Sequence, residues 1–381
     1  MISLVTRFLR LALALPLLSI AAFLLTPSFP QAQNASPSTT SITPGPKPAD
    51  APSDWKRLVG VYKGKLGSIF ILEREKRLYW LAQRWEYWMN QDSDGTYWVS
   101  LTEGPREDIL VKRTVTDEVS ELVLVKHLYV QGKGELSGHD VLENYVRSDA
   151  GGDSNHFYHV TPTPPVEELH SKALTLQPPP EPGPFRKPDL VELAMLDPAI
   201  HLDIRYASAS NFLGTPVYTQ ARAFMQRPAA DALLRALRKL QPLGYGLLIH
   251  DAYRPWYVTK IFWDATPPEG KIFVANPQEG SKHNRGCAVD LTLYDLASGK
   301  AVEMPGMYDE MSPRSFLNFP GGTSLQRWHR DLLRRAMESE GFTVNEDEWW
   351  HFDYKDWKQY GILNVPFEKL GIGQEPTPLS H

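Results

Sequence analysis

Two short segments of the chain carry side chains that could bind a metal ion and activate water. The first, SKHNRGCAVDLTL, contains His283 and Asp290, and the second, EWWHFDY, contains Glu348 and His351. Two histidines and one carboxylate are a ligand set that catalytic zinc uses, because such a site has three protein ligands and keeps its fourth position for water. A structural zinc site would be closed and rich in cysteine. This chain has one cysteine, so the pattern favours a catalytic site.

The spacing of these residues is not that of one helical face. Asp290 follows His283 by seven residues, across an Arg-Gly pair at 285–286 where the chain can turn from a loop into a strand. His351 comes 61 residues after Asp290, and Glu348 precedes it by three. Glu348 can therefore stand beside a metal-bound water as a general base without being a ligand. The alternative for Glu348 is an exposed carboxylate on a strand.

A third segment, DAYRP, places Arg254 at the end of a segment that predicts a buried strand, GYGLLIHDAY. A planar guanidinium at that position can donate two hydrogen bonds to a carbonyl oxygen that is becoming an oxyanion, or to a substrate carboxylate. The alternative is a salt bridge that holds the loop. The pattern alone does not separate the two.

The elements expected around these segments are both helices and strands. Leucines at 233, 234, 237 and 240 predict a helix over Pro228 to Leu240. CAVDLTLYDL predicts a second core strand, LQRWHRDLLRRAMESEGF an amphipathic helix that ends at Gly341, and EWWHFDY a short strand. We therefore expect an α+β catalytic domain with a small antiparallel sheet flanked by helices.

The region before it, 55–162, alternates short apolar and aromatic runs with turn signals. This pattern predicts a small all-β domain of five to seven antiparallel strands, as a sheet or half-barrel. Its aromatic side chains are either cross-strand packing partners or a stacking platform for glycan rings. They are Tyr79, Trp80, Trp85, Tyr87, Trp88, Tyr97 and Trp98.

The N-terminus has the pattern of an export signal. Residues 1–10 contain two arginines and no acidic residue, and an apolar run of 15 residues follows at 11–25. This pattern is typical of a secretory signal peptide, which we assign to 1–33, with an uncleaved anchor as the alternative. The run is short for a membrane-spanning helix, so no stable span is expected after cleavage. We predict a periplasmic or secreted protein of the bacterial envelope.

Composition and charge divide the remaining chain and limit its partners. The 381 residues are enough for two domains of usual size. With 40 basic and 45 acidic residues the net charge is −5, and no basic block favours nucleic acid as a partner. A small neutral or zwitterionic substrate fits better. The expected segments are a Pro/Ser/Thr linker at 34–54, the β domain at 55–162, a Pro-rich linker at 163–188, the catalytic domain at 189–373 and a tail at 374–381.

Taken together, these motifs resemble the zinc D-alanyl-D-alanine dipeptidases of the vancomycin-resistance type, within the D,D-carboxypeptidase and hedgehog-like metallopeptidase fold. The similarity covers roughly 189–373 and extends to DIRYASASNFLGTPVY at 203–218 and YDLASGKAVEMPGMYDEMSPRS at 294–315. Several separate motifs in the same order make the signal stronger than a single histidine and aspartate pair would.

The resemblance implies a role for each matching residue. One zinc ion per chain would be held by His283, Asp290 and His351, with Glu348 as the catalytic glutamate. Arg254 would stabilise the tetrahedral intermediate. Three further residues would contact the substrate: Asp309 at its ammonium group, Tyr206 in the pocket, and Ser281, for which a loop-capping role is the alternative.

The activity implied is hydrolysis of the D-alanyl-D-alanine dipeptide by an activated water during peptidoglycan turnover. The partners would be the small dipeptide and peptidoglycan fragments. One alternative is a D,D- or L,D-carboxypeptidase that trims peptidoglycan stem peptides. Another is a non-catalytic, zinc-containing wall-binding module, against which the intact Glu348 and Arg254 argue. Two nitrogens and a carboxylate would also accept cobalt, nickel or iron, so zinc rests on ligand type and family.

Overall fold

The computed structural model describes residues 41–101, 106–131, 136–148 and 159–371. The expected signal peptide at 1–33 and the tail at 374–381 lie outside these residues. Over the described ranges, no helix combines the length and the apolar character that crossing a membrane requires.

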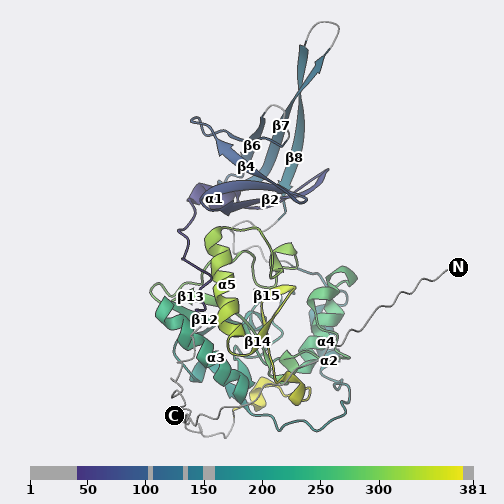
Figure 1. Ribbon diagram of the computed structural model, residues 1–381. Helices are drawn as coiled ribbons and strands as arrows, with labels where there is room; N and C mark the ends of the chain where they lie inside the picture. The colour runs from purple at the N-terminus through teal and green to yellow at the C-terminus, as the bar shows by residue number, and fades with distance from the viewer. Residues whose placement is uncertain (1–40, 102–105, 132–135, 149–158, 372–381) are drawn as a thin grey trace, which may run out of the picture. The chain divides into compact units, whose positions relative to one another are not determined.

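The β domain is a closed barrel of eight antiparallel strands that follows a short helix, α1 (Ser53–Leu58) (Figure 1). The sequence pattern predicts an all-β domain correctly but underestimates the number of strands and predicts an open form. Closure comes from the pairing of β1 with β8, in which Tyr62 lies opposite Arg147. No local signal marks a pairing between residues so far apart in the chain. The strands are β1 (Gly60–Gly64), β2 (Gly67–Arg74), β3 (Arg77–Ala82), β4 (Trp85–Gln91), β5 (Tyr97–Val99), β6 (Glu107–Arg113), β7 (Val119–Gln131) and β8 (Leu136–Arg147).

The aromatic residues of the barrel lie in two different environments, the core and the surface. Trp80 and Tyr97 are buried in the barrel core, where Trp80 packs edge-on against Tyr145. Trp85 and Trp88 are 62% and 59% exposed. Successive residues of a strand face opposite sides, so one aromatic-rich segment supplies both core and surface. A stacking platform for glycan rings, one of the two alternatives from the sequence, could therefore include only part of the set.

The catalytic domain is built on a five-stranded sheet with the order β10-β12-β13-β15-β14. Three of its four strand pairings are antiparallel, as expected. The exception is β10, which pairs with β12 in parallel, so the sheet is mixed. The strands of this domain are β9 (Leu190–Glu192), β10 (Ile200–Leu202), β11 (Phe224–Gln226), β12 (Tyr245–Asp251), β13 (Ala288–Asp295), β14 (Phe342–Asn345) and β15 (Glu348–Tyr354), of which β9 and β11 form a separate pair.

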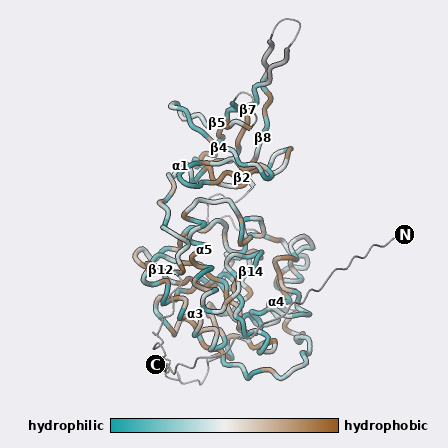
Figure 2. Tube along the Cα trace, viewed as in Figure 1, coloured by the Kyte–Doolittle hydropathy of each residue, from teal (hydrophilic) through white to brown (hydrophobic). Residues whose placement is uncertain are grey.

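Helices complete this domain and contribute buried side chains to its hydrophobic core. They are α2 (Val166–Ala173), α3 (Arg227–Leu240), α4 (Trp256–Ala265) and α5 (Ser324–Glu338). The leucine face predicted at 228–240 is buried along α3, and α3 packs against α5. Helix α4 buries Val258, Ile261 and Phe262, and along it Figure 2 shows a mixture of hydrophobic and hydrophilic residues.

The expected Pro-rich linker at 163–188 contains an element that the sequence pattern does not predict. Helix α2 lies within it and buries Val166, Leu169 and Ala173. This helix packs against α4, where His170 stacks on Tyr257 with ring centroids 5.6 Å apart. The prolines on both sides of this short segment dominate the local composition, so the sequence pattern indicates a linker instead of a helix.

Helix α5 begins with a capping box. The Thr323 hydroxyl accepts a hydrogen bond from the Gln326 amide at 3.1 Å, and the Gln326 side chain accepts one from the Thr323 amide at 2.8 Å. These contacts satisfy two backbone donors that a helix start would otherwise leave unpaired. They fix the end of a helix that packs against β13, β14 and β15, the strands that carry the candidate site.

Replacing Thr323 with alanine is expected to lower the free energy of unfolding by about 1 kcal/mol, because it removes this cap. Urea denaturation of the two proteins measures the difference. Thr161→Ala, in an exposed loop, is the matched control and should change the free energy little. Equal losses in both variants would contradict the capping role.

Candidate active site

The candidate site forms where β13 pairs with β15. In this antiparallel pairing Asp290 lies directly opposite His351, so the two side chains emerge on the same face of the sheet. His283 begins a single 3₁₀ turn, His283–Arg285, which leads into β13. That turn ends at Gly286 with φ +68°, and a Cβ there would come within 2.5 Å of Leu190. Glycine therefore allows the turn that brings His283 back to the strand pair.

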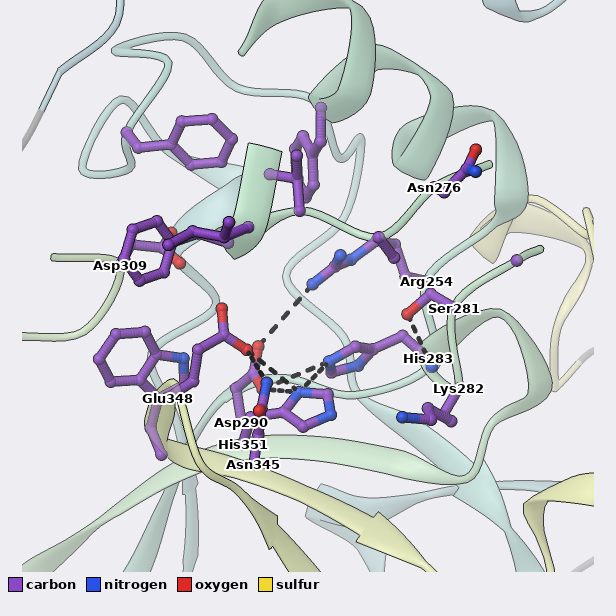
Figure 3. A pocket seen from close by; sticks show the side chains of 18 of the residues that line it. Arg254, Asn276, Ser281, Lys282, His283, Asp290, Asp309, Asn345, Glu348 and His351 are labelled. Atoms are coloured by element: carbon purple, nitrogen blue, oxygen red, sulfur yellow. Dashed lines mark hydrogen bonds and ion pairs between the residues drawn. The ribbon is translucent and has the colours of Figure 1, made fainter. Parts of the chain in front are cut away.

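Three buried side chains converge on one point (Figure 3). His283 Nε2 lies 3.0 Å from His351 Nδ1 and 3.3 Å from Asp290 Oδ1, and His351 Nδ1 lies 2.9 Å from the same oxygen. The three residues form the group that could hold a metal ion among the described residues. Two imidazole nitrogens and one carboxylate oxygen are a donor set that zinc accepts.

The other end of each side chain already has a partner. The His283 Nδ1 lies 2.6 Å from the Ala252 carbonyl oxygen, to which it can donate, and His351 Nε2 lies 2.9 Å from Asp353 Oδ1. The Tyr308 hydroxyl donates to Asp290 Oδ2 at 3.2 Å. The atoms that remain are the three that converge, so the residues fit a bound metal.

Glu348 lies beside this group. Its Oε2 is 3.9 Å from His351 Nδ1, and it accepts a hydrogen bond from the Asn345 side chain at 3.0 Å. Burial raises the pKa of Glu348, and repulsion from Asp290 raises it further, against the opposing effect of His351. The glutamate is thus a partly buried carboxylate in the cavity rather than an exposed one on a strand. A raised pKa suits a group that takes and returns a proton near neutral pH.

Arg254 lines the same cavity and is paired with Asp251. Its Nε and Nη2 lie 2.9 and 2.8 Å from Asp251 Oδ2, and Nη2 is 3.8 Å from Asp290 Oδ2. Burial opposes the charge of Arg254, but Asp251, together with Asp290 and two neighbouring tyrosines, outweighs this effect and keeps its pKa well above the usual value. The salt bridge and the cavity position, which the sequence left as alternatives, therefore occur together.

The cavity has a volume of about 480 Å³, and Asp309 closes one side of it. The Tyr206 hydroxyl donates to Asp309 Oδ1 at 3.0 Å, whereas the buried Oδ2 has no hydrogen-bond partner among the described residues. Asp309 has φ +57°, a left-handed conformation that few non-glycine residues adopt. Burial, and then the charge of Asp290, raise its pKa well above the usual value. A cation placed there would satisfy the carboxylate.

Ser281 stands on the opposite side of the metal ligands from Asp309 (Figure 3). Its Oγ accepts a hydrogen bond from the His283 amide at 3.2 Å, and its own amide donates to Asn284 Oδ1 at 2.8 Å. The loop-capping contact considered from the sequence is therefore present. Because that contact uses Oγ as an acceptor, the hydroxyl hydrogen remains available to a ligand.

Sequence reasoning missed three residues that contact the candidate site residues: Asp251, Tyr308 and Asp353. Asp251 and Asp353 lie inside the motifs DAYRP and EWWHFDY, three residues before Arg254 and two after His351. The strand alternation of EWWHFDY would have placed Asp353 on the same side as His351. Tyr308 comes from a loop, and no local pattern indicates where its hydroxyl points.

The second half of the chain is similar to known proteins. Residues 186–368 match the peptidase family model described as D-ala-D-ala dipeptidase. The D-alanyl-D-alanine dipeptidase of Escherichia coli is 35% identical over 179 residues, which are 47% of this chain and 91% of that protein. The chain belongs to the D-ala-D-ala dipeptidase family.

Two enterococcal members of the D-ala-D-ala dipeptidase family are similar to this chain over a region of comparable length. The D-alanyl-D-alanine dipeptidase of Enterococcus faecalis is 35% identical over 185 residues, covering 42% of this chain and 90% of that protein. That of Enterococcus faecium is 34% identical over 190 residues, covering 44% and 93%. The resemblance stated from the motifs is confirmed, and the chain is a peptidase. The matched region, 186–368, lies close to the expected 189–373.

A divalent metal is expected to stabilise this family member through the three converging side chains. At a zinc concentration 100 times the dissociation constant, binding adds about 2.7 kcal/mol to the free energy of unfolding. Thermal denaturation of the metal-free protein with and without zinc measures the effect. His283→Ala should lose the response, whereas His201→Ala, which changes an exposed residue of β10 outside the site, should keep it. A response that survives in His283→Ala would contradict the site.

Asp309→Asn is expected to stabilise the metal-free protein increasingly as pH rises. A carboxyl whose pKa is higher in the folded state favours unfolding once the pH exceeds its unfolded value, about 3.9. Denaturation at pH 5 and pH 8 should show a larger gain at pH 8. Asp117→Asn, also at positive φ but exposed, is the control and should show no such trend. A gain independent of pH would contradict the explanation.

Proposed function

We propose that the protein is a zinc-dependent dipeptidase that hydrolyses D-alanyl-D-alanine with Glu348 as general base. One observation carries the proposal: the Glu348 carboxylate lies 3.9 Å from His351 Nδ1 but is not one of the three converging ligands. A carboxylate in that place can act on a water at the open position of a three-ligand site. The names of the relatives supply the substrate.

A zinc ion held by His283, Asp290 and His351 would lower the pKa of its bound water toward 7 and polarise the substrate carbonyl. Glu348 accepts the proton of the attacking water. The protonated Glu348 then delivers that proton to the departing amine. Arg254, held by Asp251, donates to the carbonyl oxygen as negative charge develops on it.

The two ends of the cavity match the two ends of a dipeptide. The Asp309 Oδ2, which has no hydrogen-bond partner in the described part of the chain, suits the substrate ammonium group, with Tyr206 holding the other carboxylate oxygen. Ser281, across the metal ligands, suits the carboxylate end (Figure 3). A longer stem peptide carries an acyl group in place of the ammonium, and it would leave the buried Asp309 charge unpaired. This contrast favours a dipeptidase over a D,D- or L,D-carboxypeptidase.

We also propose that the enzyme works in the periplasm or outside the cell, on dipeptide released with peptidoglycan fragments. The support is the sequence pattern of residues 1–25, two arginines followed by an apolar run. An exported enzyme would meet products of wall turnover rather than cytoplasmic precursors.

Release of D-alanine from D-alanyl-D-alanine tests the proposal. The native protein should lose activity with a chelator and regain it with zinc. Glu348→Gln should lower kcat by about 10²–10⁴-fold, because proton transfer in the transition state is lost. Glu346→Gln, an exposed neighbour, is the matched control and should keep kcat.

A D-alanine-terminated pentapeptide serves as the second substrate. Cleavage of the dipeptide alone supports the dipeptidase, whereas efficient cleavage of the pentapeptide would assign the enzyme to the carboxypeptidases. Zinc binding without cleavage of either substrate would favour a wall-binding module instead.

A further inference from the structure

The three candidate ligands differ in what holds their outer atoms. His283 meets a neutral backbone carbonyl, that of Ala252, and Asp290 meets the hydroxyl of Tyr308. His351 alone among them has a carboxylate at hydrogen-bond distance from its outer nitrogen: its Nε2 lies 2.9 Å from Asp353 Oδ1, whereas His283 Nδ1 is 3.8 Å from Asp251 Oδ2. The two residues are i and i+2 on β15, so strand alternation places both side chains on one face.

Asp353 is itself held by Lys282. The Lys282 Nζ lies 3.0 Å from Asp353 Oδ2, while the other carboxylate oxygen faces His351. Lys282 directly precedes His283, so this ion pair joins the loop that carries one histidine to the strand that carries the other. Asp353 is 15% exposed and Lys282 40%, so solvent screens the pair only in part.

We propose that Asp353 is a positioning residue that holds His351 as a metal ligand through Nδ1, and that Lys282 fixes Asp353 for this task. The inference rests on the metal site of the proposed function. A carboxylate on the outer nitrogen selects the tautomer, orients the ring and makes the ligating nitrogen more basic. The Lys282 contact keeps that carboxylate from turning toward solvent and sets the separation of the two histidines.

Zinc affinity, measured by competition with a chromophoric chelator, tests the proposal in the full-length protein. Asp353→Ala is expected to weaken zinc binding by about 10–100-fold, the usual effect of losing such a partner. Asp353→Asn keeps an acceptor without the charge and should lose less. Lys282→Met should weaken binding in the same direction by a smaller factor.

Two matched controls separate this role from a structural one. Asp356→Asn changes a nearby aspartate that pairs with Arg186 instead. Lys358→Met removes a lysine that lies over the Trp357 ring at 5.3 Å, as Lys282 does at 5.5 Å, but is not paired with Asp353. Both should bind zinc as the native protein does.

Long-range ¹H–¹⁵N spectra of the zinc-loaded native protein give a second measurement. They should show His351 ligated through Nδ1 and His283 through Nε2. Ligation of His351 through Nε2, or native zinc affinity in Asp353→Ala, would overturn the proposal. So would a loss of thermal stability in the metal-free variants with unchanged zinc affinity, since Asp353 would then be structural only. If Asp353→Ala does not fold, Asp353→Asn and Lys282→Met decide the same question.

The experiments distinguish failure of the role proposed for Asp353 from failure of the proposed function. A native protein that binds zinc, loses affinity with Asp353→Ala and yet cleaves no dipeptide would refute the dipeptidase activity and retain the role of Asp353. A native protein that binds no zinc would refute both.

Discussion

The candidate site depends on the register in which β13 pairs with β15. Asp290 faces His351 across this pair, and Val289 faces Phe352 on the buried side of the sheet. A slip of one residue would exchange the two faces, so that apolar side chains would enter the cavity and metal ligands the core. Burial of Val289 and Phe352 therefore holds the ligands in place, and the same hydrophobic pattern that builds the core also builds the site.

The site brings several carboxyl groups together in a largely buried cavity. Asp290, Asp309 and Glu348 share one cavity, and burial raises the pKa of both Asp309 and Glu348. An unpaired buried carboxylate is costly, and the left-handed backbone of Asp309 adds strain. The buried guanidinium of Arg254 offsets part of this cost, and a bound cation and a substrate ammonium would offset more. Such a site is stabilised by its ligands, which is how a cavity gains selectivity for them.

The barrel lies outside the region that the family model matches, which begins at residue 186. Its aromatic-rich segments show that composition does not indicate which side chains are buried and which are exposed. Trp80 and Trp88 come from adjacent strands, yet the first is 1% exposed and the second 59%. The closing pair β1 and β8 joins the two ends of the domain, a contact that depends on the accumulated twist and tilt of all the strands between them.

The sequence by itself determined the candidate ligands, the glutamate beside them, the family and the main helices and strands of the catalytic domain. Those features follow from local spacing: a leucine face on α3, apolar runs on β12 and β13, and motifs whose residue types suit a metal. Tertiary structure alone decided the parallel pairing of β10, the closure of the barrel, the helix α2 among prolines and the contact of Tyr308 with Asp290. These depend on which distant segments meet and on where each side chain then points, and both are set by packing of the whole domain rather than by neighbours in the chain.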